Sequence, residues 1–319
     1  MLPHNFLLAA LSLGAAVLAA PTELVARTAR TSAPAGCLTV GSHGKYSTIG
    51  AALNALGSSK NPACIYVASG TYKEQLTINY GGALTLYGQT VDADTYKENT
   101  VTITHTISSP AAGSLDKSAT VNVVASGFKM HNINVVNGFG KSAQAVALVA
   151  NADKLGFYAC QFLGYQDTLY VKSGKQYYSN SKIEGAVDYI FGAASAWFNN
   201  CDIVSNGPGA ITASSRENAN DKTWYAFDRC NIKGSVADGS VFLGRPWRGL
   251  ARVIYQNSNL GKVVNAKGWT PMAQGATPLY YEYKNTGAGS STSARQYLSH
   301  ISGAVTKETV LGSDYATWI

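Results

Sequence analysis

Two short stretches, Gly164-Tyr-Gln-Asp-Thr-Leu-Tyr170 and Val187-Asp-Tyr-Ile-Phe-Gly192, decide how this 319-residue chain is organised. Each stretch places one aspartate, Asp167 or Asp188, among aromatic and aliphatic residues. The interval between the two carboxylates becomes informative once the rest of the chain shows the same period.

A repeat runs through residues 121–260, where a polar residue is followed by an aliphatic or aromatic one. Successive apolar positions are separated by roughly 20 to 30 residues, which is a period typical of repeat proteins. Phe162 and Ile183 each lie five residues before one of the aspartates, so the aspartates are predicted at equivalent places on neighbouring units. The units are Asn132-Ile133, Gln161-Phe162, Lys182-Ile183, Asp202-Ile203, Asn231-Ile232 and Asn259-Leu260.

Units this short contain strands between Gly, Asn and Ser turns, and none can bury its own apolar face. Stacking them as coils of a parallel β-helix buries a continuous core. The alternative is an antiparallel sandwich with tight Asn-Gly turns at regular short intervals, and such turns are scarce here. We therefore expect an all-β parallel β-helix.

Helical signals are confined to the ends of the chain. Ile49, Ala52, Leu53 and Leu56 follow helical spacing between Ser47, a plausible N-cap, and Gly57, a left-handed stop. This short N-terminal helix is predicted to cap one end of the coils. A second short helix is predicted at residues 294–298, and residues 310–319 are predicted to pack against the outside of the coils.

The N-terminal residues read as a targeting segment. Residues 5–20 form an apolar run that ends in small residues, which predicts a secretory signal over residues 1–19. A membrane anchor is the alternative, but the run is short for a span and no basic cluster follows it. Residues 20–36 are predicted to be an N-terminal arm or pro-segment, and residues 37–319 a single domain.

The charge balance is basic, with a formal net charge of +7 and only 13% charged residues. A basic extracellular protein favours a polyanionic partner. Nucleic acid is the obvious rival, but the chain has no Lys/Arg run and no recognisable nucleic-acid module. The simpler alternative is that the charge only aids solubility.

Five cysteines leave at least one unpaired. Cys201 and Cys230 precede the polar residue of consecutive units, and equivalent positions on adjacent coils are ~4.8 Å apart, within disulfide reach. They are predicted to pair. Cys160 is predicted to be a buried free thiol, and Cys37 and Cys64, which each open a strand, are a second candidate pair. No CxxC occurs, which argues against a zinc site.

The aspartates suggest catalysis if they are stacked. Two like charges that close cannot both ionise cheaply, so one carboxyl pKa rises and the other stays low. Arg245 could pair bidentately with the ionised carboxylate, and Gln144 and Gln166 could donate hydrogen bonds to an oxyanion. Taken alone, either aspartate could equally face water in a turn, and Arg245 could be an ordinary surface residue.

Four aromatic residues could form a surface on which sugar rings stack, although each could equally fill the core. They are Tyr170, Phe191, Trp247 and Trp269.

The sequence resembles the pectin methylesterase (pectinesterase) family over most of the mature chain. The family has a right-handed parallel β-helix fold, which this resemblance implies here. Gly50 and Tyr189 depart from the commonest family pattern, and the chain lacks the long inhibitor-like N-terminal region of many plant members, as in compact fungal or bacterial enzymes. The matching blocks are Gly44-Lys-Tyr-Ser-Thr-Ile49, Gly70-Thr-Tyr-Lys-Glu74, Gln144-Ala-Val-Ala-Leu148, Gly164-Tyr-Gln-Asp-Thr-Leu-Tyr170, Val187-Asp-Tyr-Ile-Phe-Gly192, Leu243-Gly-Arg-Pro-Trp247 and Gly268-Trp-Thr-Pro-Met272.

The resemblance also implies roles. Asp188 would be the nucleophile on the C6 methyl ester of a galacturonate, Asp167 the general acid and then base, and Arg245 the group that keeps Asp188 ionised. Gln144 and Gln166 would be the oxyanion donors, and the four aromatic residues would contact sugars. The pairing of Cys201 with Cys230 is similar to a bridge in plant relatives.

The implied protein is a secreted monomer that acts on methyl-esterified pectin (homogalacturonan) of the plant cell wall, without metal or cofactor.

Two rival functions remain. A lyase or polygalacturonase on the same fold would need a calcium-binding carboxylate cluster with an Arg base, or two carboxylates flanking a glycosidic oxygen. The aspartate pair alone would permit a glycosidase, and the Gln144 and Arg-Pro-Trp blocks argue against it. A non-catalytic carbohydrate-binding β-helix would tolerate loss of Asp167, Asp188 or Arg245, and all three are present.

Overall fold

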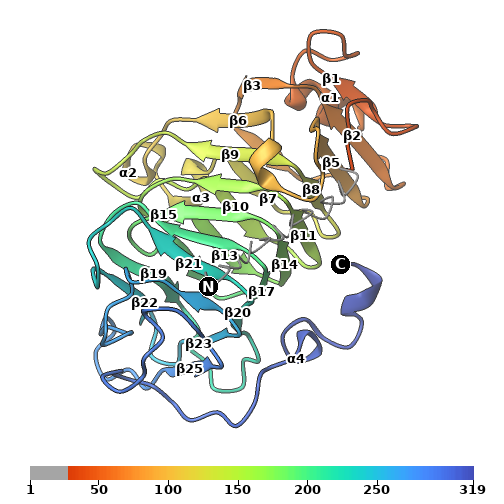
Figure 1. The fold of residues 1–319 in the computed structure, drawn as a ribbon. Coiled ribbons are helices and arrows are strands. Elements are labelled where there is room, and N and C mark those ends of the chain that lie inside the picture. The colour runs from red at the N-terminus through yellow and green to blue at the C-terminus, as the bar shows by residue number, and fades with distance from the viewer. Residues whose placement is uncertain (1–27) are drawn as a thin grey trace, which may run out of the picture.

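The computed structural model describes residues 28–319, and three parallel sheets wind through them as a right-handed parallel β-helix (Figure 1). The N-terminal strand and helix lie at one end of the stack and the last strand at the other. This confirms the predicted fold class. The predicted signal segment, residues 1–19, lies outside the described residues. In residues 28–319 no helix is long and apolar enough to cross a membrane.

Each full coil contributes one strand to each sheet, and every pairing between the named strands is parallel. The ten-stranded sheet contains β1 (Leu38–Val40), β2 (Ala63–Val67), β5 (Leu84–Gly88), β8 (Lys129–His131), β11 (Leu155–Tyr158), β14 (Lys175–Ser179), β17 (Ser195–Asn199), β20 (Tyr225–Asp228), β23 (Arg252–Gln256) and β25 (Leu279–Tyr283).

The other two sheets follow it around each coil. The eight-stranded sheet contains β3 (Gly70–Lys73), β6 (Val101–His105), β9 (Ile133–Asn137), β12 (Gln161–Leu163), β15 (Lys182–Gly185), β18 (Asp202–Ser205), β21 (Asn231–Gly234) and β24 (Asn259–Leu260). The seven-stranded sheet contains β4 (Leu76–Ile78), β7 (Val121–Val123), β10 (Leu148–Asn151), β13 (Leu169–Ser173), β16 (Ile190–Gly192), β19 (Gly209–Ser214) and β22 (Val241–Pro246).

The register of the eight-stranded sheet confirms most of the predicted repeat. Phe162 pairs with Ile183, and the ladder continues in step to Leu260. The predicted alignment of the first unit is wrong, because Phe162 pairs with Val135 and not with Ile133. Both residues of β9 face the core and are fully buried, so the apolar pattern alone could not choose between them.

The core is a column of side chains stacked at the spacing of the coils. On the ten-stranded sheet an aromatic ladder fills its middle, with ring centroids 4.4–4.9 Å apart. Stacking at this spacing buries large apolar area at every coil and fixes the register of the sheet. Its members are Phe157, Tyr178, Phe198, Phe227 and Tyr255.

Three of the five cysteines lie at the corner between the ten-stranded and eight-stranded sheets. Cys160, Cys201 and Cys230 are buried free thiols, which confirms the prediction for Cys160 and makes the predicted Cys201–Cys230 bridge wrong. The second candidate pair is a disulfide, with Cys37 Sγ and Cys64 Sγ 2.02 Å apart.

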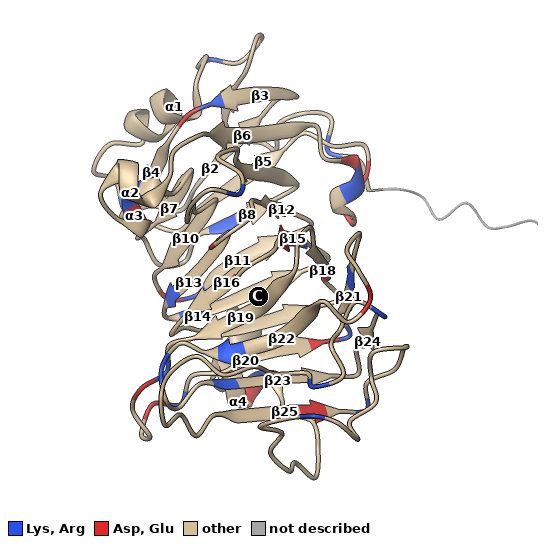
Figure 2. Ribbon diagram, turned by 90° about the vertical axis from the view of Figure 1, so that its left-hand side faces the viewer, with Lys and Arg blue, Asp and Glu red and all other residues tan. Residues whose placement is uncertain are grey.

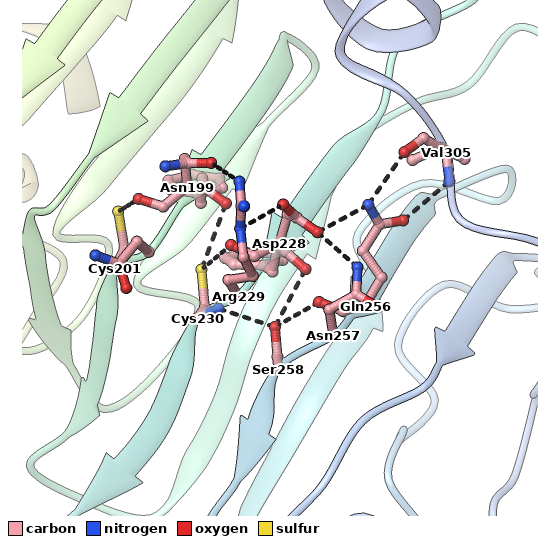
Figure 3. Close-up of polar contacts among 12 residues, drawn as sticks. Asn199, Cys201, Asp228, Arg229, Cys230, Gln256, Asn257, Ser258 and Val305 are labelled. Carbon is pink, nitrogen blue, oxygen red and sulfur yellow. Dashed lines mark hydrogen bonds and ion pairs between the residues drawn. The ribbon is translucent and has the colours of Figure 1, made fainter.

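Figure 3 shows the hydrogen bonds made by the two free thiols, Cys201 and Cys230. Cys201 Sγ donates to the carbonyl oxygen of Asn199 at 3.4 Å, and Cys230 Sγ donates to that of Phe198 at 3.4 Å. The two side chains are therefore turned toward carbonyls of the ten-stranded sheet. Burial, and then a side-chain hydrogen bond with Cys201, raise the pKa of Cys230, so the two thiols lie close together without forming a disulfide.

Helix α1 (Ile49–Ala55) lies at the same end as β1 and packs Ile49 and Ala52 into the core (Figure 1). Thr48, and not the predicted Ser47, is its N-cap, because the Thr48 hydroxyl accepts from Ala51 N. Glu74 adds a carboxylate that accepts from the first two helical N–H groups at 2.9 and 2.8 Å.

The C-terminal segment covers the outside of the ten-stranded sheet, as predicted. Val310 and Leu311 of α4 (Lys307–Leu311), together with Trp318, pack on Tyr177 and Trp197. The helix predicted at residues 294–298 is absent, and Leu298 instead pairs with Tyr280 as a parallel bridge. The remaining short helices are α2 (Ser109–Ala112), α3 (Leu115–Ser118), η1 (Tyr96–Glu98) and η2 (Tyr315–Thr317).

The described part of the N-terminal arm also lies on the coils. The backbone N–H of Arg30 donates to the carbonyl of Thr90 at 2.9 Å, and the Thr90 N–H donates back at 3.1 Å. The strands themselves carry few charges, as the predominance of tan in Figure 2 shows. The fold is thus held by stacked apolar side chains and backbone ladders more than by ion pairs.

Candidate active site

The outward face of the seven-stranded sheet presents one side chain per coil in a straight line, which we call the outer stripe. Its apolar members cluster apart from the main core, against Leu115 and Trp247. Because the strands are parallel and in register, these side chains project from the same face. The outer stripe consists of Thr77, Asn122, Val149, Tyr170, Phe191, Ala213 and Arg245.

The two aspartates lie where the chain enters this sheet on adjacent coils. Leu169 pairs with Ile190, and each aspartate lies two residues before one of them, so Asp167 and Asp188 occupy equivalent positions. Both have positive φ, 65° for Asp167 and 49° for Asp188. Nine other non-glycine residues of residues 28–319 also have positive φ, so this conformation is a recurring feature of the corners between strands.

Arg245 holds Asp188 with a bidentate ion pair. Its Nε donates to Asp188 Oδ1 at 2.8 Å and its Nη2 donates to Oδ2 at 2.7 Å. Asp188 is only 7% exposed, so solvent screens this pair weakly. The side-chain hydrogen bond to Asp188 raises the pKa of Arg245.

The surroundings of Asp167 favour its protonated form. Burial, and then the negative charge of Asp188, raise the pKa of Asp167 from 3.8 to about 7, while a side-chain hydrogen bond with Gln144 and the charge of Arg245 oppose the shift. The side chain is 3% exposed. The pair therefore combines one carboxyl group bound bidentately by an arginine with one that holds a proton near neutral pH, an arrangement that suits a nucleophile and an acid.

A small cavity of about 80 Å³ opens onto both carboxyl groups. Its walls are mostly apolar, and three of its residues were not predicted from the sequence. Leu115 comes from the start of α3, Ala213 is an outer-stripe residue, and Met272, 43% exposed, closes one side. Only Met272 had a signal, since it ends the Gly268–Met272 block. The lining residues are Leu115, Gln144, Asp167, Asp188, Phe191, Ala213, Trp247 and Met272.

Three of the predicted aromatic residues gather beside this cavity. Tyr170 stacks on Phe191 with ring centroids 4.4 Å apart, and Phe191 lies 6.0 Å from Trp247 in a tilted arrangement. Trp247 is half-buried, so part of its ring remains accessible.

The fourth aromatic residue, Trp269, was predicted to contact sugars but lies in the core. It is 0% exposed, stacks on Tyr280 at 4.0 Å and donates its Nε1–H to Glu282 at 3.2 Å. In this position the ring fills the core and cannot contact a sugar. Gln166 is half-buried next to Asp167, but its side chain is not part of the cavity lining.

The turn that carries Trp247 is held by a residue that the sequence did not single out. Arg216 is 2% exposed and donates to the backbone carbonyls of Ala219, Asp221 and Leu250, each at 2.8 Å. These bonds tie the loop after β19 to residues 246–251. Nothing in the local sequence marks a buried arginine whose hydrogen-bond acceptors are carbonyl oxygens.

Within residues 28–319, no group of three or more His, Cys, Asp or Glu side chains is arranged to hold a metal ion.

Comparison with known proteins shows the family of this chain. The Pectinesterase family model matches residues 38–314. The chain is 69% identical over 319 residues to a probable pectinesterase A of Aspergillus niger, covering 98% of both chains. A crystal structure of the pectin methylesterase from Aspergillus niger has a TM-score of 0.91 and 72% identity, covering 91% of this chain and 98% of that chain.

A more distant pectin methylesterase was solved in complex with a hexasaccharide. It has a TM-score of 0.75 and 26% identity, covering 88% of this chain and 98% of that chain. The family match spans nearly all described residues, and the near relatives are similar along their whole length. The chain therefore belongs to the pectinesterase family of ester hydrolases.

Proposed function

We propose that this pectinesterase is secreted and hydrolyses the C6 methyl esters of homogalacturonan to pectate and methanol, with Asp188 as nucleophile and Asp167 as general acid and then base. One observation carries the assignment. Asp188 makes a bidentate ion pair with Arg245, while neighbouring Asp167 has a pKa raised to about 7, at a shared apolar cavity.

In the first step, a carboxylate oxygen of Asp188 attacks the ester carbonyl carbon, and the carbonyl electron pair moves onto oxygen. The amide N–H groups of Gln144 and Gln166 are the proposed donors to this oxyanion. As the tetrahedral intermediate collapses, the proton of Asp167 passes to the methoxy oxygen and methanol leaves. The product is an anhydride between Asp188 and C6 of the sugar.

In the second step, Asp167 is a carboxylate and acts as a base. It removes a proton from a water molecule, whose oxygen attacks the same C6 carbon. The bond to Asp188 then breaks and its carboxylate is restored against Arg245. The released group is a carboxylic acid, which ionises in solution, and Asp167 is protonated again for the next turnover.

The surroundings support a polysaccharide substrate. Tyr170, Phe191 and Trp247 form an aromatic wall on which sugar rings can stack. The net charge of +7 suits a polyanion, so apparent affinity is expected to weaken as ionic strength rises. We infer that residues 1–19 are a signal, that residues 37–319 act as a single-domain monomer, and that the substrate is plant cell wall pectin. The Cys37–Cys64 disulfide is consistent with an extracellular location.

The test is to follow products from highly methylated pectin in the presence of a chelator. We expect methanol release while viscosity holds, and no methanol from the Asp188→Asn variant, which still binds pectin. An unsaturated chain end would indicate a lyase, and a new reducing end a glycosidase. Unchanged methanol release by correctly folded Asp188→Asn would overturn the assignment.

A further inference from the structure

Residues 263–273 pair irregularly with β22, the last strand of the seven-stranded sheet, and we call them the end rung. They belong to the end of the stack at which β22 and β25 lie (Figure 1). Two backbone N–H groups of the end rung, those of Thr270 and Ala273, donate to the carbonyls of the residues before and after Arg245, at 3.1 and 2.9 Å. The end rung therefore holds the backbone of Arg245 from both sides.

The end rung rests on the side chain of Trp269, which lies in the core beneath Gly244. A parallel bridge pairs the two residues, and a Cβ atom added to Gly244 would lie 3.1 Å from Trp269 Cζ3. Because the ring approaches the backbone this closely, a change in its position moves the residue that precedes Arg245.

Trp269 is itself fixed by a buried ion pair between Glu282 and Arg295. Glu282 pairs in register with Tyr255, so a carboxylate stands where the aromatic ladder would continue. Its Oε1 accepts from Trp269 Nε1 at 3.2 Å and from Arg295 Nε at 2.7 Å, and its Oε2 accepts from Arg295 Nη2 at 3.0 Å. The side chains of Glu282 and Arg295 are 2% and 1% exposed. The indole N–H, the carboxylate and the guanidinium thus form one buried network.

Arg295 also binds the backbone of the end rung. Its other three N–H groups donate to the carbonyls of Asn265, Ala266 and Gly289 at 3.0, 3.1 and 2.6 Å, so all five of its donors are used. Gly268 leaves room for the side chain, since a Cβ atom added there would lie 2.3 Å from Arg295 Cδ. The contacts of this arginine therefore converge on the end rung.

The network is poorly explained by stability alone. Desolvation offsets much of the attraction in a buried ion pair, and an aromatic residue in place of Glu282 would continue the ladder. The carboxylate instead fixes the orientation of the Trp269 ring, because a hydrogen bond to the indole N–H is directional. This end of the core also lies within electrostatic reach of the site, since burial, and then the charge of Asp188, raise the pKa of Tyr280, on which Trp269 stacks.

We propose that Glu282 and Arg295 are positioning residues that act on the reaction through Trp269. The network holds the backbone of Arg245 so that its guanidinium meets both oxygens of Asp188. This inference rests on the proposed function, in which that contact orients the nucleophile. A small displacement of the guanidinium then slows the chemical step and leaves sugar binding, which depends on other residues, unchanged.

The test uses Trp269→Phe, which keeps a ring in the core but removes the N–H that Glu282 accepts. We expect kcat for methanol release to fall roughly ten- to hundredfold with KM within about twofold of the wild-type value, the scale of loss caused by a misplacement of about 1 Å. Trp197→Phe is the matched control, because Trp197 is buried on the outside of the ten-stranded sheet and its Nε1 has no hydrogen-bond partner among the described residues. It should lower the melting temperature and leave kcat unchanged.

A double-mutant cycle separates positioning from a general loss of stability. In the Arg245→Met background, Trp269→Phe should lower kcat by less than about threefold, because its effect passes through the missing guanidinium. Glu282→Gln, which removes the charge from the network, should show the same loss of kcat in the wild-type background and the same lack of additivity.

Equal losses in the two backgrounds, or an unchanged kcat in Trp269→Phe and Glu282→Gln, would overturn the positioning role. A loss confined to KM would also overturn it, because it would place the network in sugar binding. The proposed function is judged separately, by whether the wild-type protein releases methanol at all.

Discussion

Within residues 28–319, aromatic patches lie on the outside of two different sheets, and one of them is covered by the C-terminal segment. On the ten-stranded sheet, Tyr177 and Trp197 lie beneath the C-terminal segment, where Leu311 and Trp318 seal them. On the seven-stranded sheet, Phe191 and its neighbours border a cavity that contains two carboxyl groups. The same stacking geometry thus serves stability on one face and substrate access on the other.

The two faces also differ in what they bury. Among the described residues, the covered patch contains aromatic and aliphatic side chains and no acidic one. The open patch buries Asp167, whose pKa is raised by that burial. A buried carboxyl group opposes folding, so its presence on this face marks where selection has favoured chemistry over stability. Substitutions on the two faces should therefore have opposite signatures.

The largest effect is expected from removing the cation on the open face. Arg245→Met leaves the buried Asp188 carboxylate without its bidentate partner, and breaking such a pair costs about 3–5 kcal/mol. We expect kcat for methanol release to fall roughly 10²- to 10⁴-fold. Lys262→Met is the control, because Lys262 is exposed and its Nζ lies 3.3 Å from Asp238 Oδ1 in a surface ion pair, and it should change kcat little. Equal losses in both variants would contradict the role of Arg245.

The next largest effect is a gain in stability: replacing Asp167 should raise the free energy of unfolding. In the wild-type protein the raised pKa adds stability that is fully present below about pH 3.9 and is lost as pH rises to about 7, because folding then buries a charge. Asp167→Asn removes this dependence. Its free energy of unfolding should exceed that of the wild-type protein by up to about 4 kcal/mol at pH 8 and by little at pH 4.

Denaturant unfolding at the two pH values checks this prediction. Stabilisation that is equal at pH 4 and pH 8 would mean that Asp167 is not a buried group with a raised pKa. The same variant should have lost methanol release, which separates function from stability on this face.

A substitution on the covered face should lower stability and leave activity unchanged. Trp318→Ala opens a gap over Tyr177 and Trp197 and should lower the free energy of unfolding by about 3 kcal/mol. Since the cavity with Asp167 and Asp188 lies on a different sheet, kcat and KM should be unchanged below the melting temperature. Thermal unfolding and initial rates give both values, and a changed KM with unchanged stability would contradict the division between the faces.

The smallest effect is expected at Arg216. Lysine cannot reach three divergent carbonyls, so Arg216→Lys should loosen the turn that carries Trp247. We expect KM for pectin to rise roughly three- to tenfold with kcat nearly constant. Arg229→Lys, at an exposed corner far from this turn, is the control. A fall in kcat with constant KM would place Arg216 in the chemistry instead.

The sequence could predict the features that depend on the length of the repeat. Ile183 follows Phe162 by the same interval as Asp188 follows Asp167, and this interval set both the register of the coils and the alignment of the two carboxyl groups. It could not predict which way a side chain turns. Cys201 and Cys230 are aligned as predicted, yet each thiol donates to a carbonyl of the ten-stranded sheet.

For aromatic residues, too, the sequence could not predict which way a side chain points. Trp247 and Trp269 both lie in blocks shared with the family, but one borders the cavity and the other fills the core. Leu115 and Arg216 act through loops whose course follows from tertiary contacts, so no local pattern could place them. The repeat therefore determined the scaffold and the carboxyl pair, while the cavity walls required the structure.

The central claim is that Asp167 supplies a proton while Asp188 attacks, and its most direct test is the pH dependence of kcat/KM for methanol release from highly methylated pectin. Because the pKa of Asp167 is raised to about 7, we predict that kcat/KM falls tenfold per pH unit above about pH 7. A value that stays constant or rises between pH 6 and pH 9 would contradict Asp167 as the acid.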